Sequence, residues 1–197
     1  MERYLFMRSV IEALGRGASF RLYFARFLRI AAVGIAFAGL VTLIDAWKFI
    51  SRHEAAGIIG GISYMIFFAA GIYMVVHAMV IRAGHINALP ERSFTLIPLC
   101  ALASLLTGEA YAAFCASVSI GGGVLIWFTR GDAYGLLRDV SAFTPQPSGE
   151  DFLGGLLLMI RGAVRGAVVL TAGYLASDLF LAVERMAERP IRGEAAP

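Results

Sequence analysis

Four long apolar stretches, separated by more polar segments, dominate the pattern of hydrophobic and polar positions along the chain. They cover residues 27–49, 55–81, 94–128 and 152–184. Each reaches the roughly 20 residues that a helix needs to span the hydrocarbon core of a bilayer. None alternates apolar and polar residues with the period of two that marks the strands of a membrane barrel. We therefore expect an all-α integral membrane protein, a four-helix bundle within a spanning domain at residues 23–187.

The two ends of the chain have a different pattern. Residues 1–22 separate apolar and charged side chains onto two helical faces, with Tyr4, Met7, Ile11 and Leu14 on one and Arg8, Glu12 and Arg16 on the other. This separation predicts an N-terminal amphipathic helix lying on the inner membrane surface. Residues 188–197 are expected to form a disordered tail.

The third and fourth stretches are longer than a bilayer requires. Each exceeds 30 residues, and at about 1.5 Å per residue such a helix is longer than a hydrocarbon core of about 30 Å. It must tilt, project or break, and Gly121-Gly122-Gly123 and Gly154-Gly155 are the expected places for a break or bend. Between the two stretches, residues 133–143 are predicted to form a short helix at the outer surface.

Composition and charge agree with a membrane location. Hydrophobic residues make up 59% of the 197 residues and charged residues 16%, whereas soluble domains average about 45–50% and about 25%. With the N-terminus inside, the inner flanks hold Arg3, Arg8, Arg16, Arg21, Arg26, Arg29, Arg82, Arg92, Arg185, Arg189 and Arg192, and the outer flanks hold Lys48, Arg52, Arg130 and Arg138. Because cytoplasmic flanks are the basic ones, we expect both termini in the cytoplasm.

The same charge pattern bears on partners and origin. The basic residues are dispersed over membrane flanks and do not form a groove with stacking aromatics, so no nucleic-acid partner is expected. High Gly, Ala and Arg usage with a single Lys indicates a bacterial protein, and hence the bacterial inner membrane. The lipid bilayer and other membrane subunits are the expected partners.

Glu109 is the only charged residue between Phe94 and Phe128. It shares one helical face with three small residues, Ala113, Ser117 and Gly121. Small residues let membrane helices approach closely, so this face is predicted to point into the bundle. Two further small-residue pairs at the same spacing are candidate packing sites, Gly57 with Gly61 and Gly162 with Gly166.

Three interpretations of Glu109 remain open. It can form a structural ion pair with Arg165, the closer in predicted depth, or with Arg161, or make a polar contact to another subunit. It can instead be a proton or cation relay, with Asp178 and His77 as further stations, because intramembrane ionisable residues are functional candidates by default. It can also be a protonated or snorkelling side chain without a special role.

No pattern indicates catalysis, a metal site or a cofactor. Cys100 and Cys115 lie 15 positions apart on one predicted helix, about 22 Å, too far for a disulfide. Gly121-Gly122-Gly123 lacks the Lys-Ser/Thr of a phosphate loop. Only one histidine, His77, lies within a span, which disfavours a bis-histidine haem, and it is expected to be hydrogen-bonded near the inner interface, with Tyr73 one turn away. The chain is therefore predicted not to be an enzyme.

The segment after the second span has a further pattern. Arg82-Ala83-Gly84-His85-Ile86 followed by Leu89-Pro90-Glu91-Arg92 resembles the corresponding loop of the small membrane subunits of TRAP transporters. The resemblance implies four spans, a large membrane subunit as partner and no substrate-binding residues in this chain. From the residues themselves we expect a non-catalytic subunit that packs in and stabilises a larger membrane complex; a small homo-oligomeric transporter or channel using Glu109 is the alternative.

Overall fold

Four long α-helices make up nearly all of the chain that is described. A computed structural model describes residues 18–52, 54–89, 96–129, 137 and 143–193. The helices are α2 (Ala18–Ile50), α3 (Ala55–Asn87), α4 (Leu96–Thr129) and α6 (Phe152–Gly193). Each contains a stretch of 31 to 35 residues that is long and apolar enough to cross a membrane. The predictions of an all-helical chain and of four candidate membrane-spanning helices are confirmed.

The helices extend beyond the apolar stretches, chiefly at one end of the molecule. α2 begins at Ala18, α3 continues to Asn87 and α6 continues to Gly193. A helix satisfies its own backbone hydrogen bonds, so it can continue past the apolar residues into a polar environment. Consequently Arg82–Ile86 is helical rather than part of a loop, and the first six residues of the predicted tail belong to α6.

The glycine-rich stretches do not interrupt the helices. α4 runs without a break through Gly121, Gly122 and Gly123. Gly154 and Gly155 lie in the first turn of α6, where Asp151 Oδ1 accepts a hydrogen bond of 2.7 Å from Gly154 N. Of the three options that the sequence left open, tilt, projection or a break, a break occurs at neither place. These glycines contact neighbouring segments, and those contacts explain their presence better than a bend does.

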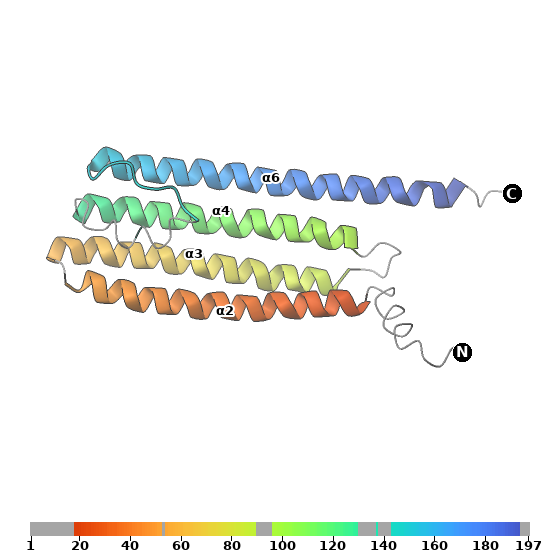
Figure 1. The fold of residues 1–197 in the computed structure, drawn as a ribbon, viewed down its shortest axis with the longest axis horizontal. Helices are drawn as coiled ribbons and strands as arrows, with labels where there is room; N and C mark the ends of the chain where they lie inside the picture. Colours follow the sequence, from red (N-terminus) through yellow and green to blue (C-terminus); the bar gives the residue numbers. More distant parts are fainter. Residues whose placement is uncertain (1–17, 53, 90–95, 130–136, 138–142, 194–197) are drawn as a thin grey trace, which may run out of the picture.

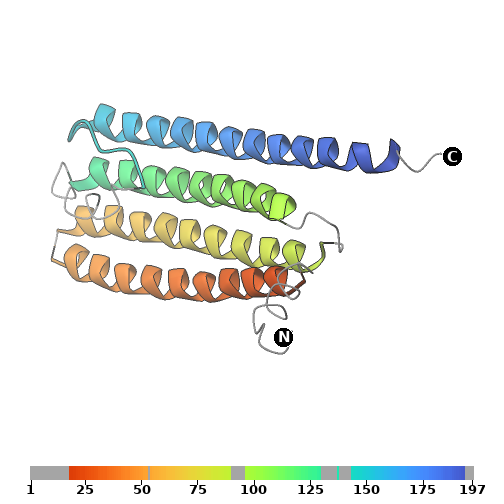
Figure 2. The same ribbon diagram turned by 45° about the vertical axis from the view of Figure 1, so that its right-hand side comes forward.

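The helices form an open row, so the four-helix bundle predicted from the sequence is not confirmed. Figures 1 and 2 show α2, α3, α4 and α6 side by side in chain order, each antiparallel to the next. Extensive contact is confined to the pairs α2–α3, α3–α4 and α4–α6. The first and last helices are therefore at opposite edges of the row. The start of α2 and the end of α6 lie at the same end, where α6 projects beyond the other helices (Figure 1).

Glycine positions explain the row. A Cβ on Gly121 would lie 2.8 Å from Phe67 Cβ of α3, and a Cβ on Gly123 would lie 2.6 Å from the backbone oxygen of Gly155 in α6. Residues that are two positions apart in a helix, such as Gly121 and Gly123, point in directions about 200° apart around its axis. These glycines therefore place α3 and α6 on nearly opposite sides of α4. A helix with close neighbours on opposite sides is the middle of a row.

The interior of the row consists of two apolar clusters. One joins α2, α3 and α4 toward the end where α2 begins, and it contains Ala25, Leu28, Ala32, Val75, Met79, Ala83, Ile86, Leu99 and Leu106. The other lies toward the opposite end and contains Tyr64, Phe68, Val118, Leu125, Ile126, Leu137 and Leu158. Many other apolar side chains, such as Ile30, Val33 and Val168, point away from the row. A bilayer would cover such side chains without any protein partner.

Part of the connection between α4 and α6 lies along α4 and is not confined to its end. The Phe143 ring contacts the Phe114 ring edge-on at 6.2 Å between centroids, and Leu137 is buried against Gly122. Phe114 is 15 positions before Thr129, about 22 Å along the helix. Residues 130–136 and 138–142, most of the predicted short surface helix, lie outside the described residues, as do residues 1–17, which contain most of the predicted amphipathic helix.

Candidate functional site

Glu109 is the centre of a polar cluster that joins three helices. Arg82 of α3 donates from Nε to Glu109 Oε2 at 3.0 Å and from Nη2 to Oε1. Tyr174 of α6 donates its hydroxyl to Oε1 at 3.3 Å. The Arg82 and Glu109 side chains are only 16% and 24% exposed. Arg82, Glu109 and Tyr174 are called the ion-pair cluster below.

The geometry of antiparallel helices brings this pair together. Side chains on a helix lean toward its N-terminus. α3 and α4 run in opposite directions. Arg82 near the end of α3 therefore leans back along the helix axis toward Glu109, and Glu109 leans toward the end of the molecule where Arg82 lies. The two-point contact between a guanidinium and a carboxylate is the strongest form of such a pair, and it neutralises a charge that lipid would not solvate.

The prediction that Glu109 pairs with Arg165 or Arg161 is wrong, and the register of α4 against α6 explains why. A Cβ on Gly108 would lie 3.3 Å from the backbone oxygens of Val169 and Leu170, whereas Gly166 packs on Ala112. Glu109 is thus level with residues beyond Arg165. Glu109 and Tyr111 also point in directions about 200° apart around α4. Arg165 lies over the Tyr111 ring, 5.7 Å from its centroid, and so contacts a different side of α4 from the one that carries Glu109.

A shallow groove between α3 and α4 lies beside the ion-pair cluster. It has a volume of about 350 Å³ and is lined by Tyr73, Met74, His77, Ala78, Ile81, Arg82, His85, Glu109 and Ala113. Arg82 Nη1 also donates to His85 Nδ1 at 3.4 Å. The groove therefore combines an apolar wall with two imidazoles and an ion pair. We call it the α3–α4 groove.

His77 contacts Tyr73 as expected, but through ring stacking. The two rings are 5.6 Å apart between centroids with an interplanar angle of 17°. His77 is exposed on the groove side of α3. Asp178 is exposed on α6, and among the described residues no hydrogen bond or ion pair joins it to the ion-pair cluster. The predicted relay stations are thus not linked into a chain by the contacts described.

The predicted packing residues occupy helix contacts. Ser117 and Gly121 are buried against α3, and Ala113 lines the α3–α4 groove beside Glu109. Gly57 is buried in α3, and a Cβ on Gly61 would meet Ile50 of α2. Gly162 and Gly166 pack on α4. Small residues therefore lie where neighbouring helices approach closely, as membrane packing requires.

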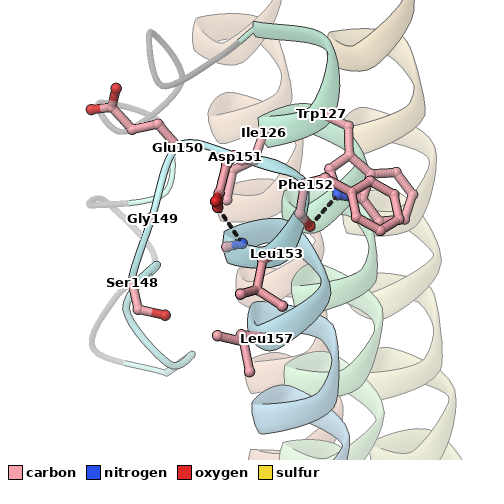
Figure 3. Close-up of a pocket in the computed structure, with 10 residues that line it drawn as sticks. Ile126, Trp127, Ser148, Gly149, Glu150, Asp151, Phe152, Leu153 and Leu157 are labelled. Carbon is pink, nitrogen blue, oxygen red and sulfur yellow. Dashed lines mark hydrogen bonds between the residues drawn. The ribbon is translucent and has the colours of Figure 1, made fainter.

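A second, larger cavity lies at the opposite end of the row (Figure 3). It has a volume of about 900 Å³ and is lined by Ile126, Trp127, Ser148, Gly149, Glu150, Asp151, Phe152, Leu153, Gly154 and Leu157. The Trp127 ring stacks on Phe152 at 4.8 Å, and its Nε1 donates to the Phe152 backbone oxygen at 2.9 Å. These contacts join the end of α4 to the start of α6, so the polar groups here stabilise a helix connection.

The remaining chemistry-bearing side chains form no reactive group in the part of the chain that is described. No three His, Cys, Asp or Glu side chains there come together as a metal site would need. Cys115 is buried, with Sγ 3.5 Å from the Gly162 backbone oxygen, and Cys100 is half-buried. In comparisons with protein families, curated proteins and solved structures, no match to this chain is found.

Proposed function

We propose that this chain is a non-catalytic subunit that packs in and stabilises a larger membrane protein complex. The observation that carries the proposal is the open row of α2, α3, α4 and α6, in which extensive contact is limited to consecutive helices. Such a row offers two broad sides to neighbouring membrane proteins. By contrast, a protein that conducts a solute alone needs helices that surround a path.

The ion-pair cluster supports the same proposal. Glu109 is held by Arg82 and Tyr174, so its carboxylate joins three helices. A carboxylate with two oxygens already bonded to a guanidinium is a poor carrier of mobile protons, because releasing it would leave a charged partner in a poorly solvating environment. The cluster thus suits a structural connection between helices in a subunit whose role is to assemble.

We place the subunit in the bacterial inner membrane with both termini in the cytoplasm. The Arg-rich flanks at the end of the row where α2 begins and α6 ends support this orientation, since basic flanks stay in the cytoplasm. The bacterial origin rests on amino-acid usage. The expected partners are other membrane subunits and the surrounding lipid.

A small transporter or channel component is the second candidate, either homo-oligomeric or similar to the small membrane subunit of a TRAP transporter. The observation in its favour is the α3–α4 groove, which places His77 and His85 beside the Arg82–Glu109 pair. A second copy, or a larger subunit, would be needed to close this groove into a path.

The Glu109→Gln variant separates the two functions. If Glu109 is structural, the variant lowers the amount of assembled complex recovered from native membranes, because Arg82 loses its counter-charge. If Glu109 is a relay, complex recovery stays at the wild-type level while transport by that complex is lost. Normal assembly combined with lost transport would overturn the proposal of a purely structural subunit.

A further inference from the structure

Two arginines one helical turn apart lie on an exposed side of α6, next to its contact with α4. Arg161 and Arg165 are both exposed. The glycines beside them pack on the middle of α4: a Cβ on Gly162 would lie 3.2 Å from the Cys115 backbone oxygen, and one on Gly166 would lie 3.2 Å from that of Ala112. α4 spans Leu96–Thr129, so both arginines are level with its central turns. We call this surface the arginine flank.

The arginine flank is far from either end of the apolar part of α6. The nine residues from Phe152 to Ile160 carry no charged side chain, which places Arg161 about 14 Å and Arg165 about 20 Å from Phe152 along the helix. The stacked rings of Trp127 and Phe152 lie at that end, and tryptophan is typical of the membrane interface. An arginine side chain spans only a fraction of 20 Å, so Arg165 cannot reach lipid headgroups by snorkelling.

Within the described residues, these two charges lack a carboxylate partner. Arg165 lies over the Tyr111 ring, which offers its face to the cation but no counter-charge. Glu109 is paired with Arg82, and Asp45 is paired with Lys48 at 2.8 Å. Asp178 is 13 positions beyond Arg165, about 20 Å along the helix. Charged side chains inside a membrane normally face a partner or water.

We propose that the arginine flank is the docking surface for a transmembrane helix of a different membrane protein, one that carries an Asp or Glu at this depth. The inference rests on the proposed function and adds the chemistry of its partner. A second copy of this chain does not fit. Related by a two-fold axis along the membrane normal, two copies would bring the same arginines together. Glu109, the carboxylate of the described spans nearest to them in depth, is already paired with Arg82.

The test compares three variants of the tagged full-length chain in its native membranes. Arg161→Gln with Arg165→Gln removes both charges, Arg161→Lys with Arg165→Lys keeps them, and Arg29→Gln removes an exposed arginine of α2 as a matched control. The double Gln variant is expected to reduce the recovered complex tenfold or more. The Lys and Arg29→Gln variants should stay within about twofold of wild type. The amount of the chain found in the membrane and the midpoint temperature of its thermal unfolding check that it folds. Both should be unchanged or higher in the double Gln variant.

A photo-crosslinking residue at Val168, which is 62% exposed one turn from Arg165, identifies what contacts the arginine flank. The expected adduct is a transmembrane helix of another protein with a carboxylate within one turn of the crosslink. Arg165→Glu in this chain should lower the amount of complex. Changing the partner's carboxylate residue to Arg at the same time, which exchanges the two charges, should restore it. Wild-type complex levels in the double Gln variant would overturn the inference, as would adducts only to lipid, to a copy of this chain or to a helix without a carboxylate. A wild-type chain that purifies alone would instead remove the proposed function itself.

Discussion

Glu109 shows how one charge can be accommodated in a long apolar helix. Its two oxygens receive bonds from Arg82, and Tyr174 adds a third donor from the other side of α4. Removing one member of such a pair leaves the other charge without compensation, and that loss usually exceeds the net contribution of the intact pair. The cluster therefore fixes the relative positions of three helices more than it adds to total stability.

A double-mutant cycle measures this coupling. Arg82→Gln and Glu109→Gln are each expected to lower the free energy of unfolding by about 3 kcal/mol, because each leaves a single charge in a poorly solvating environment. The variant with both changes should be more stable than the sum of the two losses predicts, since no unpaired charge remains. Denaturation of the chain in detergent micelles gives the three values. Losses that simply add would contradict the pairing.

Tyr174→Phe is the matched control for the cycle. It removes one hydrogen bond and no charge, so the expected loss is only about 0.6 kcal/mol, the average for hydrogen bonds between membrane helices. A loss as large as that of Glu109→Gln would contradict this account, because it would show that the Tyr174 hydroxyl contributes as much as the ion pair.

Residue patterns predicted that Glu109 points toward other helices but named the wrong partner. A carboxylate followed by small residues every four positions indicates a face turned toward neighbouring helices. Arg82 was assigned to the inner membrane flank because it lies beyond the apolar stretch 55–81. The signal that favours it is the lean of both side chains toward each other on antiparallel neighbours. Tyr174 gave no comparable signal, because its role depends on the register of α6 against α4.

Close approach of helices is the main feature at the scale of the element. Gly123 and Gly155 meet backbone to backbone, and a Cβ on either would lie under 3 Å from the other's oxygen. The sequence predicted that the four helices exist, because each contains an apolar stretch of spanning length. It missed the start of α2 and the ends of α3 and α6, which extend beyond the apolar residues. It did not predict that the glycine triplet would stay helical, because the same residues permit a bend or a close contact, and only the neighbouring helix selects between them.

Two glycine substitutions test this interpretation. Gly123→Ala should destabilise the protein by about 1–3 kcal/mol, because the added methyl group overpacks the contact between α4 and α6. Gly84→Ala should be neutral or stabilising by up to about 1 kcal/mol, since a Cβ there meets nothing within 4 Å and alanine favours the helix. Unfolding in detergent micelles measures both. Equal effects of the two changes would contradict a packing role for Gly123.

At the scale of the whole molecule, the open row distinguishes this chain from a four-helix bundle. Composition and apolar length do not separate the two arrangements, because in both of them each helix needs the same length and a surface that is apolar nearly all round. Placement of glycines on opposite sides of α4 does separate them, but only once it is known which helix each glycine faces. A row also leaves the arginine flank and the α3–α4 groove on its outer surfaces, where another membrane protein could cover them.

The mass of the intact assembly, measured by native mass spectrometry directly from native membrane vesicles, tests the subunit function most directly. The chain itself has a mass of 21.2 kDa. We expect a predominant species that contains this chain together with a different and larger membrane protein in a fixed ratio. A predominant mass of 21.2 kDa, or of an integer multiple of it, would contradict that function and favour a protein that works alone or as a homo-oligomer.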